Sequence, residues 1–142
     1  MREYRPQSYG AGASGERELM RMGQTHVDMR VHSNSRSVVV SALADTAATF
    51  TKVPRVVLDE LGLETEYEVE VEIGDVRTIL RQLVLADVEI SGVRRPVLVS
   101  AGGNGEQPLV GYTTLETLGF KVNTVAHKLE PTPAIEYCGG SA

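Results

Sequence analysis

Few side chains in this 142-residue sequence are of a type and spacing that support chemistry. The histidines His26, His32 and His127 accompany no Gly-x-Ser-x-Gly nucleophile elbow, which disfavours a serine hydrolase. His26 and His32 stand six residues apart on a predicted strand, about 20 Å by strand rise, so we do not expect them to share a metal ion. No P-loop or dinucleotide-binding glycine pattern is present, and the glycine-rich stretch 102–105 does not join a strand to a helix. We therefore expect neither a metal nor a cofactor.

Asp45 is the one carboxylate whose position is unusual. It follows the apolar run Val38–Leu43 and precedes the small residues Thr46-Ala47-Ala48-Thr49. A carboxylate at the end of a buried strand can close an Asx-turn or cap the next helix, and this interpretation needs no function. The alternative is that the strand holds a catalytic carboxylate in place. The residues alone leave both interpretations open.

The elements that must position Asp45 are mainly strands. Residues 27–31 and 66–73 alternate apolar and polar side chains with period two, and glutamates form the polar side of the second segment. The run 38–43 is typical of a strand covered on both faces. Further strands are predicted at 78–80, 83–90, 94–100 and 120–125, with turns at Gly74-Asp75 and Ser91-Gly92. Many short strands with little helix predict an all-β barrel or sandwich.

Two short helices interrupt the strands. Residues 52–62 are predicted to form the first, with Pro54 in its first turn and Gly62 ending it in the left-handed conformation. Residues 113–119 are predicted to form the second, capped by threonine and ended by Gly119. Residues 1–22 show no strand or long helical period, so we expect a flexible extension there, one domain over 23–130 and an irregular tail over 131–142.

The loop Leu43-Ala44-Asp45-Thr46-Ala47-Ala48-Thr49 resembles the active-site loop of the retropepsin-like, or retroviral-type, aspartic proteases. That family's pattern is apolar-x-Asp-Thr/Ser-Gly-Ala-Thr/Ser/Asp. Leu109-Val110-Gly111 is similar to the apolar-apolar-Gly signature that precedes the family's C-terminal helix. The segments 53–62 and 113–122 resemble the matching stretches of bacterial and archaeal single-domain members, so the likeness covers about residues 23–130.

The resemblance implies a closed acid-protease barrel with one or two short helices, and a homodimer that hydrolyses peptide bonds. Asp45 would be the catalytic aspartate, one from each chain, and Thr46 would hydrogen-bond across the dimer axis. A hairpin tip would close over the peptide as a flap. The residues implied to contact substrate are Ala47, Ala48, Thr49, Gly74, Asp75 and Val76.

Ala47 departs from the family pattern, which has glycine at this point, and Val76 stands where the flap usually has a second glycine. Glycine lets two loops approach closely at a two-fold axis. A methyl group there can misplace the paired carboxylates and lower the rate. Two alternatives follow: a catalytically weak or inactive retropepsin-like dimerisation or peptide-binding module, and an unrelated β-barrel binding domain in which Asp45 is a turn residue.

Composition narrows the expected partners. The net charge of −5 disfavours nucleic acid, whose phosphates require a basic face. No apolar stretch approaches the roughly 20 residues that span a bilayer, and no signal-peptide pattern opens the chain, so we expect a cytoplasmic protein with no membrane partner. The single cysteine, Cys138, cannot form an intramolecular disulfide. The expected partners are a peptide or protein substrate and a second copy of this chain.

Overall fold

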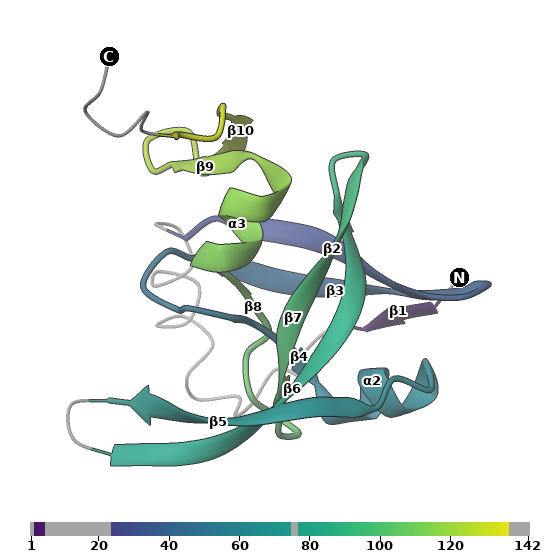
Figure 1. Cartoon of the computed structure of the whole chain (residues 1–142). Helices are drawn as coiled ribbons and strands as arrows, with labels where there is room; N and C mark the ends of the chain where they lie inside the picture. The colour runs from purple at the N-terminus through teal and green to yellow at the C-terminus, as the bar shows by residue number, and fades with distance from the viewer. Residues whose placement is uncertain (1, 5–23, 75–76, 137–142) are drawn as a thin grey trace, which may run out of the picture.

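Strands dominate the part of the chain that the structure, a computed structural model, describes: residues 2–4, 24–74 and 77–136 (Figure 1). The helices in these residues are short, α2 (Arg55–Glu60) and α3 (Tyr112–Leu118). The strands are β1 (Arg2–Tyr4), β2 (His26–Ser33), β3 (Arg36–Asp45), β4 (Thr51–Pro54), β5 (Thr65–Ile73), β6 (Arg77–Ile90), β7 (Val93–Gly102), β8 (Leu109–Gly111), β9 (Phe120–Asn123) and β10 (Lys128–Pro131).

The main sheet closes into a barrel. Its strands run in the order β3-β2-β6-β7-β4-β8, and β8 pairs back onto β3, which makes a ring of six strands within the described residues. β5 continues the sheet as a hairpin with β6, and β1 lies parallel to β3. β9 and β10 form a separate antiparallel pair. The predicted fold class, an all-β closed barrel with one or two short helices, is confirmed.

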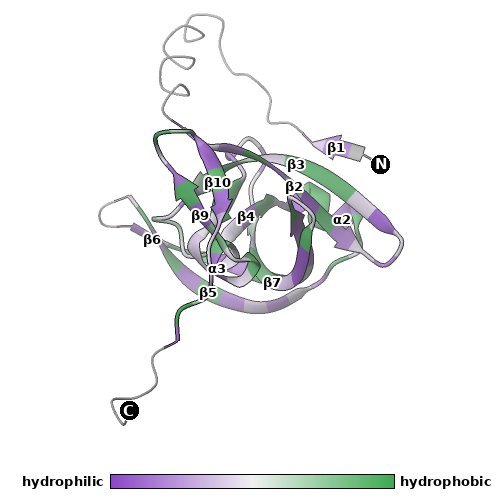
Figure 2. Ribbon diagram, turned by 90° about the horizontal axis from the view of Figure 1, so that it is seen from above, coloured by the Kyte–Doolittle hydropathy of each residue, from purple (hydrophilic) through white to green (hydrophobic). Residues whose placement is uncertain are grey.

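Alternation along the strands builds the core, as green and purple stretches along the same ribbons show in Figure 2. In β2, Val27, Met29 and Val31 are buried while the intervening residues are exposed or half-buried. β3 alternates in the same way, with its intervening apolar residues half-buried, so the prediction of a strand covered on both faces is only partly met. A closed barrel buries one face of each strand fully, and outer elements cover the other in places.

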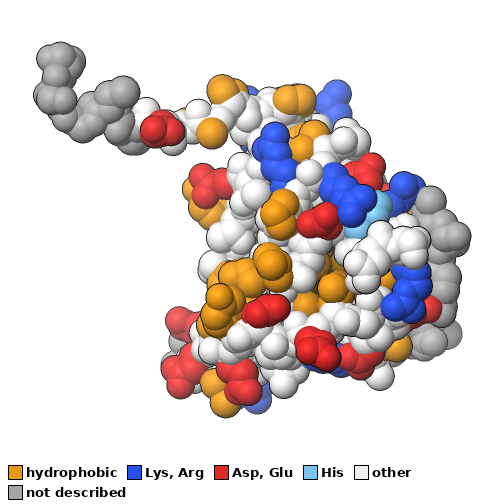
Figure 3. All heavy atoms as spheres, turned by 45° about the vertical axis from the view of Figure 1, so that its right-hand side comes forward, with side chains coloured by type: hydrophobic (Ala, Val, Ile, Leu, Met, Phe, Trp, Pro, Cys, Tyr) orange, Lys and Arg blue, Asp and Glu red, His pale blue; other side chains and the backbone are white. Residues whose placement is uncertain are grey.

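The glutamates of β5 lie on a solvated face, as predicted. Each is exposed, whereas the alternating Val69, Val71 and Ile73 are half-buried. Figure 3 shows acidic side chains gathered at the lower left of the molecule, where Figure 1 places the end of the β5–β6 hairpin. The hairpin therefore turns an apolar side toward the barrel and an acidic side toward water.

The starts of both helices differ from the sequence prediction. Residues 51–54 form β4, which pairs parallel with β7, and α2 begins only after Pro54, whose φ of −56° and ψ of 138° end the strand. Burial of Thr51 and Val53 inside the barrel outweighs local helix propensity here. α3 is preceded by Gly111 with no side-chain cap, so the predicted threonine cap is wrong. Gly62 and Gly119, at φ +69° and +81°, end the helices as predicted.

Several strand boundaries also differ. β6 is one continuous strand where two were predicted, while Ser91-Gly92 forms the expected turn with both residues at positive φ. β1 lies in the segment for which no strand was expected, and β10 extends to Pro131 at the start of the predicted irregular tail. Both are short edge pairings with little sequence periodicity. No helix in the described ranges is long and apolar enough to cross a bilayer.

Candidate active site

Asp45 is the last residue of β3, which is held on both sides. β2 pairs antiparallel with β3 up to Leu43, and the Ala44 N–H donates to the Thr25 carbonyl at 2.9 Å. On the other side β8 runs parallel, with Asp45 opposite Gly111. The backbone that carries the carboxylate is therefore fixed by the barrel and not by the loop that follows.

The loop after Asp45 folds back onto its carboxylate. The Ala47 N–H donates to Asp45 Oδ1 at 3.0 Å, and the Ala48 N–H donates to the Asp45 carbonyl at 3.2 Å. This is the Asx-turn considered from the sequence. It orients one carboxylate oxygen, and among the described residues no further hydrogen bond reaches the half-buried Asp45 side chain. A turn of this kind is compatible with both interpretations of Asp45.

The same loop is tied to the start of α3. The Tyr112 N–H donates to the Ala48 carbonyl at 2.7 Å, and both the N–H and the hydroxyl of Thr113 donate to the Thr49 carbonyl, at 3.1 and 2.7 Å. These bonds satisfy N–H groups of the first helical turn that have no partner within a helix. Residues 48 and 49 are thus held against α3 while Asp45 is held by β3.

A buried hydroxyl pair lies under this crossing. Thr51 donates to the Thr114 hydroxyl at 2.6 Å and accepts from the Gly111 N–H at 3.0 Å, and neither threonine is exposed. A Cβ on Gly111 would lie 2.4 Å from the Phe50 carbonyl atoms, so only glycine fits where these segments pass. The sequence singled out Gly111 but missed the threonines, which are 63 residues apart and carry no local signal.

Most of the predicted substrate-contacting residues line one cleft of about 550 Å³. Asp45 and the following Ala47, Ala48 and Thr49 line one side, and the hairpin residues 70–74, including Gly74, line another. Asp75 and Val76, the rest of the predicted flap tip, lie outside the described residues. The structure therefore brings the loop and the near end of the hairpin together around one space.

Thr46 lies elsewhere. It lines a second, larger hollow of about 940 Å³, which Asp45 also borders, together with parts of α3 and the segment 132–135. Tyr112 lies here too, and its hydrogen bond to Glu116 raises the pKa of the phenol, so this hydroxyl stays neutral at ordinary pH. Asp45 thus stands between two spaces, with Thr46 facing the one and Ala47–Thr49 the other.

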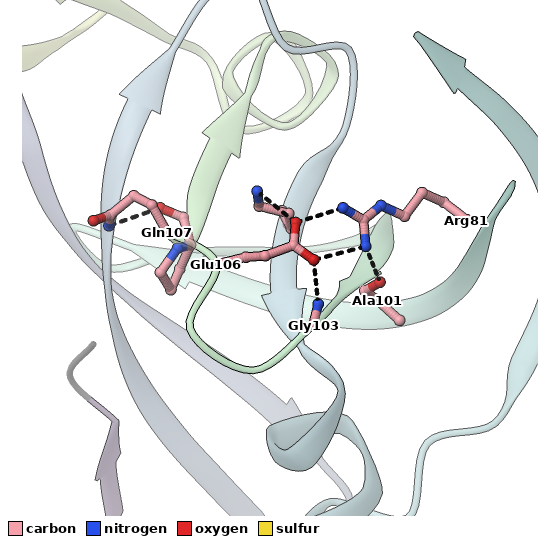
Figure 4. Close-up of polar contacts among 7 residues, drawn as sticks. Arg81, Ala101, Gly103, Glu106 and Gln107 are labelled. Atoms are coloured by element: carbon pink, nitrogen blue, oxygen red, sulfur yellow. Dashed lines mark hydrogen bonds and ion pairs between the residues drawn. The ribbon is translucent and has the colours of Figure 1, made fainter. Parts of the chain in front are cut away.

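Charged residues that the sequence analysis did not single out also border the cleft. Lys52 and Arg81 line it, and both are bound by Glu106 from the loop after β7 (Figure 4). The pKa of Glu106 is lowered to about 2, mainly by its hydrogen bonds to the Arg81 guanidinium, although burial of the carboxyl raises the pKa. These residues are 25 to 54 positions apart, so no motif in the sequence connects them.

No protein-family model matches this chain, and no curated protein matches it in sequence. Several chains of solved structures align with it, among them the following two. The retroviral protease-like domain of Ddi1 from Leishmania major is 14% identical, with 75% of this chain and 88% of that one covered, at a TM-score of 0.49. The EIAV protease in complex with the inhibitor HBY-793 is 16% identical, with 70% and 90% covered, at a TM-score of 0.48. Both similarities are at the level of the fold.

Proposed function

We propose that this protein is a homodimeric aspartic endopeptidase in which each chain supplies one Asp45. The observation that carries the proposal is the placement of Asp45. It ends a central barrel strand, its carboxylate is oriented by the Ala47 N–H, and it borders a cleft of about 550 Å³ beneath a two-stranded hairpin. A carboxylate beside a cleft of this size is the usual starting point for an active-site hypothesis.

The chemistry needs two carboxylates, and the active-site loop supplies one per chain. Two Asp45 side chains meeting at a two-fold axis would share one proton, because like charges about 3 Å apart cannot both ionise. The ionised carboxylate would take a proton from a bound water as that water attacks the peptide carbonyl carbon. The protonated carboxylate would donate to the carbonyl oxygen, and a proton would then pass to the leaving nitrogen.

The neighbouring residues have separate roles in this proposal. Thr46, on the side of the larger hollow, would hydrogen-bond to the partner's loop at the dimer axis. Ala48 and Thr49 would contact an extended peptide, and the hairpin tip from Gly74 to Val76 would close over it and exclude water. The half-buried Val71 and Ile73 of β5 would give the hairpin an apolar inner side.

Ala47 favours a second candidate, a retropepsin-like module that dimerises or binds peptides without cutting them. Its N–H already orients one Asp45 oxygen, as a glycine's would. Its methyl group, however, occupies space at an exposed position where two loops would have to meet. The two candidates share the fold and the dimer and differ only in turnover.

Cleavage of a peptide library tests the proposal. The wild-type protein should cut, and pepstatin-type inhibitors should block it. Asp45→Asn should lower kcat by more than about 10³-fold, because it removes the shared proton chemistry. Asp28→Asn, at an exposed position on β2, is the matched control and should retain full activity.

Sedimentation and the pH profile complete the test. The active species should be a dimer with a bell-shaped pH–rate profile, since a pair of carboxylates titrates in two steps. A protein that stays monomeric at high micromolar concentration contradicts both candidates. A dimer that binds peptides and cuts none supports the second candidate alone, and a flat profile between pH 4 and 8 contradicts the Asp45 mechanism.

A further inference from the structure

Two cations face the candidate substrate cleft from the barrel. Lys52 projects from β4 and Arg81 from β6, and their side chains are only 20% and 14% exposed. Both belong to the lining of the cleft that Asp45 borders. Half-buried cations at the edge of a binding cleft interact more strongly with an entering charge than surface cations do, because water screens them less.

Glu106 holds these cations in place from behind. It binds the Arg81 guanidinium with both oxygens, at 3.0 and 2.5 Å, and its Oε2 lies 3.2 Å from Lys52 Nζ. The Gly103 N–H donates to Oε1 at 2.6 Å, and Figure 4 shows the carboxylate between Arg81 and this loop. Glu106 itself does not line the cleft. Lys52 and Arg81 therefore belong to the wall of the cleft, and Glu106 does not.

The glycine-rich loop after β7 is built around this arrangement. A Cβ on Gly102 would lie 2.8 Å from Lys52 Cγ, and a Cβ on Gly103 would lie 2.8 Å from Glu106 Oε1. Glycine at both positions lets the loop approach the two side chains closely. The first two glycines of the stretch 102–105, which fits no phosphate-binding pattern, are thus explained by the space that Lys52 and Glu106 occupy.

The charge balance of this cluster is positive. Glu106 is one carboxylate shared by two cations, which leaves one unit of positive charge on the wall of the cleft. Arg81 is occupied by Glu106 and by the Ala101 carbonyl at 3.3 Å. Lys52 makes one such bond to Glu106, and its ammonium group carries three donors. Arg81 thus uses three of its five N–H donors and Lys52 one of its three, so Lys52, held by a single hydrogen bond among the described residues, is the freer of the two to turn toward a ligand.

The carboxylates that also border the cleft offset this positive charge only in part. Glu70 and Glu72 of the hairpin also line the cleft, but both are exposed, so solvent screens them. The carboxylate of Asp45 accepts a hydrogen bond from the Ala47 N–H. Because the pKa of Glu106 is about 2, its carboxylate stays ionised above about pH 3.

We infer that Lys52, held in position by Glu106 beside Arg81, is a specificity-determining residue. It binds an acidic side chain of the peptide, aspartate or glutamate, next to the bond to be cut. The inference rests on the proposed function, since it names the substrate class of the same cleft. An extended peptide presents a side chain every 3.3 Å or so on alternating sides, so a carboxylate near the scissile bond can reach this wall.

Matched peptides test the inference. A set of apolar octapeptides carries glutamate, glutamine or lysine at each position flanking the scissile bond. At one or more of these positions the wild-type kcat/KM should favour glutamate over glutamine by roughly tenfold, the value of one charge-assisted hydrogen bond. Lys52→Gln should bring the ratio to within about twofold of unity, Lys52→Arg should keep it, and Lys128→Gln, at an exposed position on β10, should not change it.

The pH and binding measurements separate the possible outcomes. Below about pH 4 the peptide's glutamate becomes protonated, so the preference should disappear there. The same peptides, fluorescently labelled, are also titrated against the Asp45→Asn protein by anisotropy. Preferential binding of the glutamate peptides that depends on Lys52, without any cleavage by the wild type, upholds the inference and refutes the proposed hydrolysis.

Other results overturn the inference. Cleavage with no glutamate preference at any position, or with a preference that Lys52→Gln leaves intact, refutes it while the proposed function stands. A preference for lysine would also refute it and would assign the cleft to the hairpin glutamates. Failure of every peptide to be bound or cut refutes both proposals.

Discussion

Replacing Gly111 by alanine should destabilise the protein severely, because this glycine lies where three parts of the candidate site cross. It ends β8 opposite Asp45, precedes α3 and is buried. An added Cβ would lie 2.4 Å from both the carbonyl carbon and the oxygen of Phe50 and 2.8 Å from the Thr51 nitrogen. Ordinary contacts of this kind are about 3.5–4 Å, so backbone has to move by about 1 Å.

The cost of that movement has two parts. Overpacking against backbone in a buried region costs about 1–3 kcal/mol. A shift of this size also breaks the 3.0 Å hydrogen bond from the Gly111 N–H to Thr51, which leaves a buried donor unpaired and costs about 1–3 kcal/mol more. We therefore expect Gly111→Ala to lower the free energy of unfolding by about 2–6 kcal/mol, and Tm by about 8 °C or more.

Urea unfolding followed by circular dichroism measures this change, with Gly102→Ala as the control. Gly102 is also a buried glycine at the end of a strand, but its added Cβ would meet the flexible Lys52 side chain, at 2.8 Å, in place of backbone. Gly102→Ala should cost less, about 1–2 kcal/mol, because a change of the Lys52 χ1 rotamer relieves the contact without moving backbone, although it gives up the contact with Glu106. Equal effects of the two substitutions, or a loss below about 1 kcal/mol for Gly111→Ala, would refute the reasoning.

Three further predictions concern the same region. Glu106→Gln should lower the free energy of unfolding at pH 7 by no more than about 1–2 kcal/mol, because solvent partly screens the pair. The pKa of Glu106 is depressed from 4.5 to about 2, so in denaturant titrations this difference should be complete above pH 4.5 and vanish as the pH falls to about 2. Thr51→Val should cost about 1–3 kcal/mol by thermal melts and Thr114→Val less, because only the first change leaves the Gly111 N–H without its acceptor; equal losses would contradict this. Ala47→Gly should raise kcat by about 10-fold or more if the methyl group holds the paired loops apart, and an unchanged peptide-cleavage rate would show that it does not.

Local features of the sequence were enough to predict much of the fold. Alternation with period two marked β2 and β5, an apolar run marked β3, and glycines at positive φ marked the ends of both helices and one hairpin turn. Those signals are local because each reflects which side of a strand faces the core or which residue tolerates a left-handed backbone. β4 was missed for the opposite reason, since its strand conformation comes from pairing with β7 and not from its own residues.

The sequence by itself also determined where the candidate catalytic carboxylate stands, because an apolar run, Asp45 and small residues are adjacent in the chain. Only the tertiary structure decided what surrounds that carboxylate. The Thr51–Thr114 pair and the Lys52–Glu106 contact join residues 63 and 54 positions apart, on elements that meet only when the barrel closes. Polar contacts between distant segments leave no periodicity in either segment, so Asp45 was visible in the sequence while the charged wall of its cleft was not.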